Sequence, residues 1–153
     1  MRYRLLCVGR IRERALSVLV DDFAKRLTRY HALDIVEVPD ARIRDTESAM
    51  RNEGQSLLRR IDDAEPVWLL ERSGNELSSE ELAARIDGLE QQGLSRLTLV
   101  IAGPYGSSHA LRERANFRWS LSRLTFLHEW TRALVVEQLY RAAKIARGEP
   151  YHH

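Results

Sequence analysis

Four short apolar segments alternate with longer segments of helical periodicity, and this alternation constrains the fold more than any other feature. The apolar segments span residues 3–8, 33–38, 67–70 and 97–101. Between them, apolar residues recur every three or four positions, as in the helix predicted from about Ala15 to Tyr30. Strands that alternate with helices form parallel sheets, because each crossover places a helix on a face of the sheet. The sequence therefore predicts one α/β domain over residues 1–153, with a mainly parallel sheet and helices on both faces.

Local signals set the bounds of other elements. A helix is predicted from about Thr46 to Ile61, and Gly54 in its middle favours either close helix packing or the approach of a ligand. Ser78 and Glu81 form a capping box that begins the next helix. A short polar helix is expected after residues 107–108. Loops are expected at residues 39–44, 71–75, 102–106 and 121–126.

The last helix, predicted from about Glu129 to Arg147, is apolar almost all the way round. Its polar residues Glu137, Arg141 and Lys144 form one narrow stripe. A helix this apolar needs cover on more than one side. The sheet would supply one cover and a second subunit the other, so we expect a homodimer with this helix in the interface.

Composition excludes several classes of protein. The net charge is only +2, and arginines outnumber lysines by 22 to two, which fits either phosphate recognition or genomic base composition. No apolar run reaches the roughly 18 residues of a membrane span, and the first one is too short for a signal peptide. The single cysteine, Cys7, has no intramolecular partner, and no zinc-ligand spacing occurs. We expect a cytoplasmic protein with neither membrane nor metal.

Common nucleotide and hydrolase motifs are missing. The sequence has no GxxxxGK[ST] loop, no GxGxxG fingerprint and no GxSxG elbow. What remains are apolar, glycine-bearing loops after Leu70, Ile101 and Leu121. Such loops either hold an adenine between apolar side chains or simply close the core.

Four motifs follow one another in the second half of the chain. They are AGPYG at 102–106, WSLSRLTFLH at 119–128, EQLYRA at 137–142 and GEPYH at 148–152. In this order and spacing they resemble the RlmH family of SPOUT-class methyltransferases, and further matches extend the resemblance over the whole chain. The resemblance implies methyl transfer from S-adenosylmethionine to N3 of a pseudouridine in 23S ribosomal RNA of the assembled ribosome. It also implies a carboxyl-terminal trefoil knot and an obligate homodimer.

The resemblance also implies where the cofactor binds. The positions carried over are Leu70, Ala102, Gly103, Leu121, Ser122, Arg123, Leu124, Thr125 and Phe126. Much of the recognition is expected through backbone groups. Ala102 departs from the family, which usually has a Gly-Gly pair there. If its φ is positive, alanine costs on the order of 1 kcal/mol, and its methyl group also narrows the approach to the ligand.

For the chemistry, the family motifs point to Arg141, Tyr151 and His152. Arg141 would stabilise the anionic base, Tyr151 would stack on or position it, and His152 would take the proton or orient the base. The alternative for Arg141 is an ion pair with Glu137 four residues earlier. Five arginines have two interpretations, as contacts to RNA phosphates or as a solvated basic face: Arg10, Arg12, Arg14, Arg42 and Arg44.

Two other functions fit the same residues. One is a SPOUT homologue that binds RNA without methylating it, which would explain Ala102. The other is a methyltransferase of this fold that acts on tRNA. The absence of an appended RNA-binding domain argues against this second alternative. The sequence leaves open the modified nucleotide, any need for prior pseudouridylation, and the proton acceptor.

Overall fold

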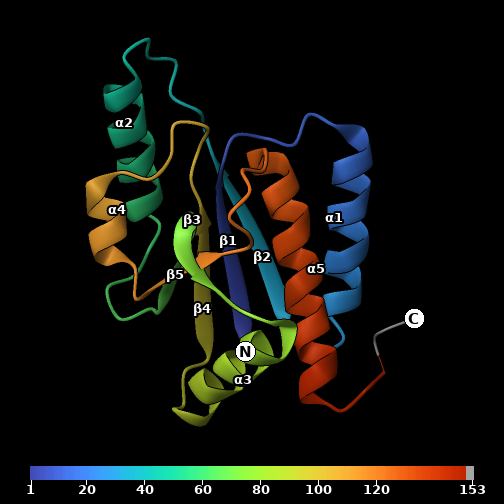
Figure 1. Ribbon diagram of the computed structural model, residues 1–153. Coiled ribbons are helices and arrows are strands. Elements are labelled where there is room, and N and C mark those ends of the chain that lie inside the picture. Colours follow the sequence, from blue (N-terminus) through green and yellow to red (C-terminus); the bar gives the residue numbers. More distant parts are fainter. Residues whose placement is uncertain (151–153) are drawn as a thin grey trace.

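A five-stranded parallel sheet forms the middle layer of the part of the chain that the computed structural model describes, residues 1–150 (Figure 1). The strand order is β2-β1-β4-β3-β5, and every pairing is parallel. The prediction of a mainly parallel sheet is therefore confirmed. The strands are β1 Arg2–Val8, β2 Ala32–Val38, β3 Val67–Glu76, β4 Arg96–Ile101 and β5 Phe117–Ser120.

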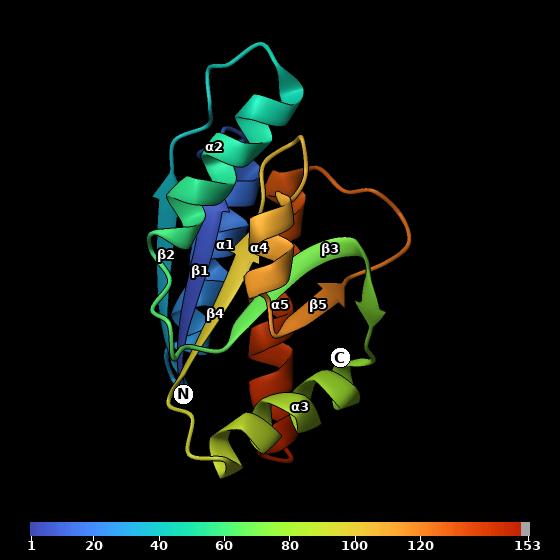
Figure 2. The same cartoon turned by 90° about the vertical axis from the view of Figure 1, so that its left-hand side faces the viewer.

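Helices cover both faces of this sheet, as predicted. On one face α5 packs between α1 and α3, and on the other α2 packs against α4 (Figures 1 and 2). The helices are α1 Arg14–Leu27, α2 Thr46–Leu58, α3 Ser79–Gln91, α4 His109–Arg114 and α5 His128–Ala146.

Alternation along the strands divides the core in two. Tyr3, Leu5 and Cys7 of β1 are buried under the α1, α3 and α5 layer, whereas Leu6 and Val8 join the core beneath α2 and α4. Successive side chains of a strand point to opposite faces, so a strand covered on both sides must be apolar throughout. This explains the continuous apolar runs in the sequence.

Two local signals act as the sequence predicts. Ser78 and Glu81 form the capping box at the start of α3, with both reciprocal hydrogen bonds present. Gly54 lies in α2 where it meets α4, and a Cβ added there would lie 2.2 Å from Ser108 Oγ. Gly54 therefore permits the close helix contact that was one of its two predicted roles.

Two strand assignments from the sequence were wrong. Residues 71–75, predicted as a loop, continue β3 beyond an irregularity in its pairing between Leu70 and Asn75. The residues there are polar, and polar residues occur both in loops and in an irregular strand such as this one, so the sequence did not indicate a strand. Strand β5 was not predicted at all, because its four residues are too few to show a period.

The apolar surface of α5 is covered largely within the chain. Val135, Val136, Leu139 and Ala142 are buried against the sheet, α1 and α3. The helix therefore does not need a second subunit to bury these residues, contrary to the reasoning from the sequence. Among the helices of residues 1–150, none is both long and apolar enough to cross a membrane.

Candidate active site

A pocket of about 390 Å³ opens at the carboxyl ends of β3, β4 and β5. Open parallel sheets bind ligands at this edge, where the loops that follow the strands converge. Its walls come from Leu70–Ser73 of β3, the turn after β4, the loop after β5, and the first turn of α5. Trp119 and Arg112 complete it.

The turn after β4 is closed by a hydrogen bond from the Gly106 N–H to the Gly103 carbonyl, 3.0 Å long. Gly106 has a φ of 93°, which favours glycine. Ala102 lines the pocket, and within residues 1–150 every residue with positive φ is a glycine. The conformational penalty considered for alanine at this position therefore does not arise. Only its methyl group distinguishes it from glycine here.

Gly103 is required for a different reason, the approach of a buried carboxylate from α2. A Cβ added to Gly103 would lie 2.3 Å from Glu53 Oε2. Glu53 is only 2% exposed; its Oε1 accepts a hydrogen bond from the Ala41 N–H at 2.9 Å, whereas its Oε2 has no hydrogen-bond partner within the described chain. Burial raises the pKa of this carboxyl, and the hydrogen bond from Ala41 opposes that effect. Glu53 thus supports the turn from behind the pocket wall.

The loop after β5 is held to β3 by one hydroxyl. Ser120 Oγ lies 3.0 Å from the Arg72 carbonyl and 2.9 Å from the Ser122 carbonyl. Ser122 Oγ in turn accepts a hydrogen bond from the Leu124 N–H at 3.1 Å. These contacts give the loop a defined backbone shape, so its N–H and C=O groups can recognise a ligand.

One corner of the pocket is charged. Arg112 Nε donates to Glu71 Oε1 at 2.6 Å, and an Arg118 guanidinium nitrogen lies 3.6 Å from Glu71 Oε2. Glu71 is largely buried, so two arginines compensate a carboxylate that would otherwise be costly to desolvate. The pocket thus combines apolar walls with one fixed polar corner.

Comparison with known proteins decides the family. A family model described as "Predicted SPOUT methyltransferase" matches residues 1–152. The chain belongs to this family. Relatives named "Ribosomal RNA large subunit methyltransferase H" include one from Gloeobacter violaceus, 43% identical over 153 residues that cover 100% of this chain and 99% of the relative. Another, from Desulfitobacterium hafniense, is 39% identical over 158 residues and covers 99% of each chain. The resemblance to the RlmH family is confirmed.

Within this SPOUT fold, the structure brings most of the predicted cofactor residues together. Arg123 is the exception, because it is exposed and does not line the pocket. Those that line the pocket are Leu70, Ala102, Gly103, Leu121, Ser122, Leu124, Thr125 and Phe126.

Sequence reasoning missed several lining residues. Glu71 directly follows the apolar run of β3. Because ligands bind at the carboxyl ends of parallel strands, this position could have been predicted to line the pocket. Trp119 lies in the unpredicted strand β5, and Thr131 lies in the first turn of a helix that was interpreted from its apolar surface and its polar stripe. Arg112 carries no local signal.

Of the three predicted catalytic residues, one lies away from the pocket and two lie outside the residues that the structure describes. Arg141 donates from Nε and a terminal nitrogen to Glu137 Oε1, at 3.1 and 2.7 Å, so the predicted ion pair is present. At about 1.5 Å per residue, Arg141 lies about 15 Å along α5 from Thr131 in the pocket wall. Tyr151 and His152 lie outside the described residues. In residues 1–150, no group of three or more His, Cys, Asp or Glu side chains could hold a metal.

Proposed function

We propose that this protein is an S-adenosylmethionine-dependent methyltransferase that methylates N3 of a pseudouridine in 23S ribosomal RNA of the bacterial ribosome. The observation that carries the proposal is the pocket formed by the loops after β3, β4 and β5 in a chain of the SPOUT family. The names of its relatives, which describe methyltransferases of large-subunit ribosomal RNA, support the choice of substrate.

The pocket fits a cofactor of this size and chemistry. Its volume falls within the range of roughly 300 to 1,000 Å³ typical of small-molecule sites. Leu70, Leu121 and Phe126 would enclose the adenine, and the 102–106 turn would contact it through backbone groups. When bound, S-adenosylmethionine supplies an electrophilic methyl group on a sulfonium.

The chain's task is to align a base with that methyl group and to manage one proton. The residues that line the pocket would hold S-adenosylmethionine, which would supply the methyl group to N3 of the base as N3 loses its proton. We assign stabilisation of the anionic base to Arg141, acceptance of the proton to His152, and positioning of the base to Tyr151.

We further infer a homodimer whose carboxyl-terminal region forms a trefoil knot, as the family resemblance implies. Arg141 lies too far along α5 to act on the pocket of its own chain, so a second copy would supply it. Three large apolar side chains beside the pocket support a dimer: Leu124 and Leu127, each 70% exposed, and Trp130, 48% exposed. A patch of this kind is typical of an interface.

Cofactor binding is tested first, by calorimetric titration with S-adenosylmethionine and measurement of the mass in solution. We expect binding by a dimer. Ala102→Leu should weaken binding at least tenfold, because the larger side chain would fill part of the pocket. Ala84→Leu, the same change on the exposed surface of α3, should not. A folded protein that binds no cofactor at millimolar concentration would refute the proposal.

Methyl transfer to ribosomes from a strain lacking its own enzyme tests the substrate. Arg141→Ala should lower kcat at least tenfold, whereas Glu137→Ala removes the same ion pair and should leave kcat nearly unchanged. Equal effects of the two variants would reduce Arg141 to a structural role. Ribosome binding without transfer would favour the binding-only homologue, and transfer to tRNA alone would favour the tRNA enzyme.

A further inference from the structure

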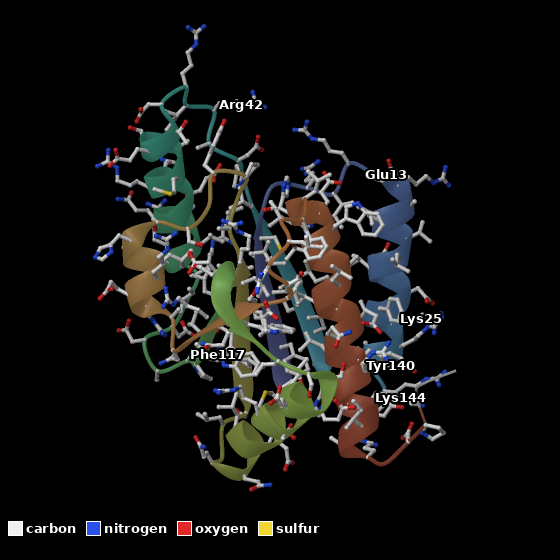
Figure 3. All side chains as sticks on the ribbon, viewed as in Figure 1. Glu13, Lys25, Arg42, Phe117, Tyr140 and Lys144 are labelled. Atoms are coloured by element: carbon white, nitrogen blue, oxygen red, sulfur yellow. The ribbon has the colours of Figure 1, made fainter. Side chains whose placement is uncertain are left out.

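Two connections at the carboxyl edge of the sheet carry exposed arginines, which we call the basic edge. Arg10, Arg12 and Arg14 follow β1, and Arg42 and Arg44 follow β2. The strand order places β1 next to β4, whose end lines the pocket, and β2 on the other side of β1. Figure 3 shows Arg42 and Glu13, which marks the β1–α1 connection, at the same end of the molecule. The basic edge and the pocket therefore share one rim.

Three carboxylates beside the basic edge already have hydrogen-bond or ion-pair partners other than its arginines. Glu13 caps α1 by accepting a backbone N–H at 3.2 Å, and Asp45 caps α2 in the same way at 2.8 Å. Glu37 pairs with the buried Arg132 of α5. Asp40 and Glu47, the latter in the first turn of α2, are further exposed acids. Among residues 1–150, none of the five guanidinium groups of the basic edge has an ion-pair partner.

Both connections are fixed to the walls of the pocket through their backbones. The Ala41 N–H donates to Glu53, whose carboxylate lies against Gly103 of the pocket turn. The Glu13 N–H donates to Glu129 Oε2 at 3.2 Å, in the first turn of α5. The arginine side chains are thus free, while the segments that carry them are held in place relative to the pocket.

From these observations we infer that the basic edge binds RNA phosphates that adjoin the target nucleotide on the β1 and β2 side of the pocket, and so holds the RNA over the pocket. This inference rests on the proposed function, which supplies RNA as the substrate. Fixed backbones with free guanidinium groups suit phosphates, because phosphate contacts set position and register without reading sequence. The alternative interpretation, that these arginines only form a solvated basic surface, gives no reason for the hydrogen bonds that fix both connections to the pocket walls.

The test measures binding of the full-length protein to 70S ribosomes at several salt concentrations. Each phosphate contact contributes roughly 0.7 to 0.9 to the slope of log K against log salt. Arg42→Gln/Arg44→Gln should therefore lower the magnitude of this slope by about 1.5 and weaken binding roughly 30-fold at about 0.1 M salt. Arg10→Gln/Arg12→Gln should behave alike. Affinity for S-adenosylmethionine should stay unchanged, because none of these residues lines the pocket.

The matched control is Arg2→Gln/Arg29→Gln, which removes two exposed arginines at the opposite edge of the sheet. It changes the net charge equally and should keep the wild-type slope. If all three double variants weaken binding equally, only net charge matters and the inference fails. It also fails if the edge variants lose affinity for heparin but not for ribosomes, which would indicate another polyanion. Failure of the proposed function looks different, because the wild-type protein would then not methylate ribosomes at all.

Discussion

Gly103→Ala tests how the pocket turn is supported. The added Cβ would lie 2.3 Å from Glu53 Oε2, 3.1 Å from Glu53 Cδ and 3.2 Å from Val8 Cγ1. Glu53 is buried and hydrogen-bonded to Ala41, so it cannot move aside freely. Overpacking of this kind costs about 1 to 3 kcal/mol. For a domain of this size, the Tm should fall by roughly 3 to 10 °C.

The assay is denaturant unfolding together with thermal unfolding. Gly88→Ala is the matched control, because a Cβ at Gly88 in α3 meets nothing within 4 Å. It should stabilise the protein by up to about 1 kcal/mol through helix propensity. Gly103→Ala in a Glu53→Ala background should cost at least about 1 kcal/mol less than in the wild type, since the obstructing carboxylate is gone.

Glu53→Gln separates shape from charge. It keeps the volume of the side chain, so Gly103→Ala should cost as much in this background as in the wild type. If Gly103→Ala is as stable as the wild type, or if Glu53→Ala fails to relieve its cost, the proposed contact between α2 and the pocket turn is wrong.

Two further predictions concern other buried contacts. Gly54→Ala should destabilise the protein by about 1 to 3 kcal/mol in urea unfolding, and Ser108→Gly should restore most of the loss, because the added Cβ would lie 2.8 Å from Ser108 Cβ. Burial raises the pKa of Cys7 to about 12, so its stabilising contribution is complete below about pH 8.5 and is lost as pH rises toward 12. Between pH 7 and pH 10 the wild type should therefore lose about 2 kcal/mol relative to Cys7→Ala, and equal losses would show that the thiol is not buried in the protonated form.

Local patterns predicted much of the fold. The alternation of apolar runs with helical segments predicted the parallel sheet and its two helical layers, because strand and helix periods are local properties. The capping box at Ser78 likewise acts within one turn. Weak local signals failed, as in the four residues of β5 and the polar continuation of β3 after Leu70.

The residues proposed to bind the cofactor were predicted by a different route. Leu70, Gly103 and Leu121 were carried over from the family resemblance, and the pocket confirms that these distant positions come together. The resemblance could not supply contacts that depend on packing. A sequence pattern does not give the φ angle of Ala102. In the structure this angle is not positive, so the strain considered for alanine at this position does not arise.

The amino-acid sequence by itself determined the order and type of most elements, the apolar strands and the family. Only the tertiary structure decided that Glu71 and Arg112 form a charged corner and that Glu53 of α2 lies behind Gly103. It also decided that the basic edge shares a rim with the pocket. These residues lie far apart in the chain and meet because parallel strands bring their carboxyl ends to one edge, a long-range consequence of topology that no local period encodes.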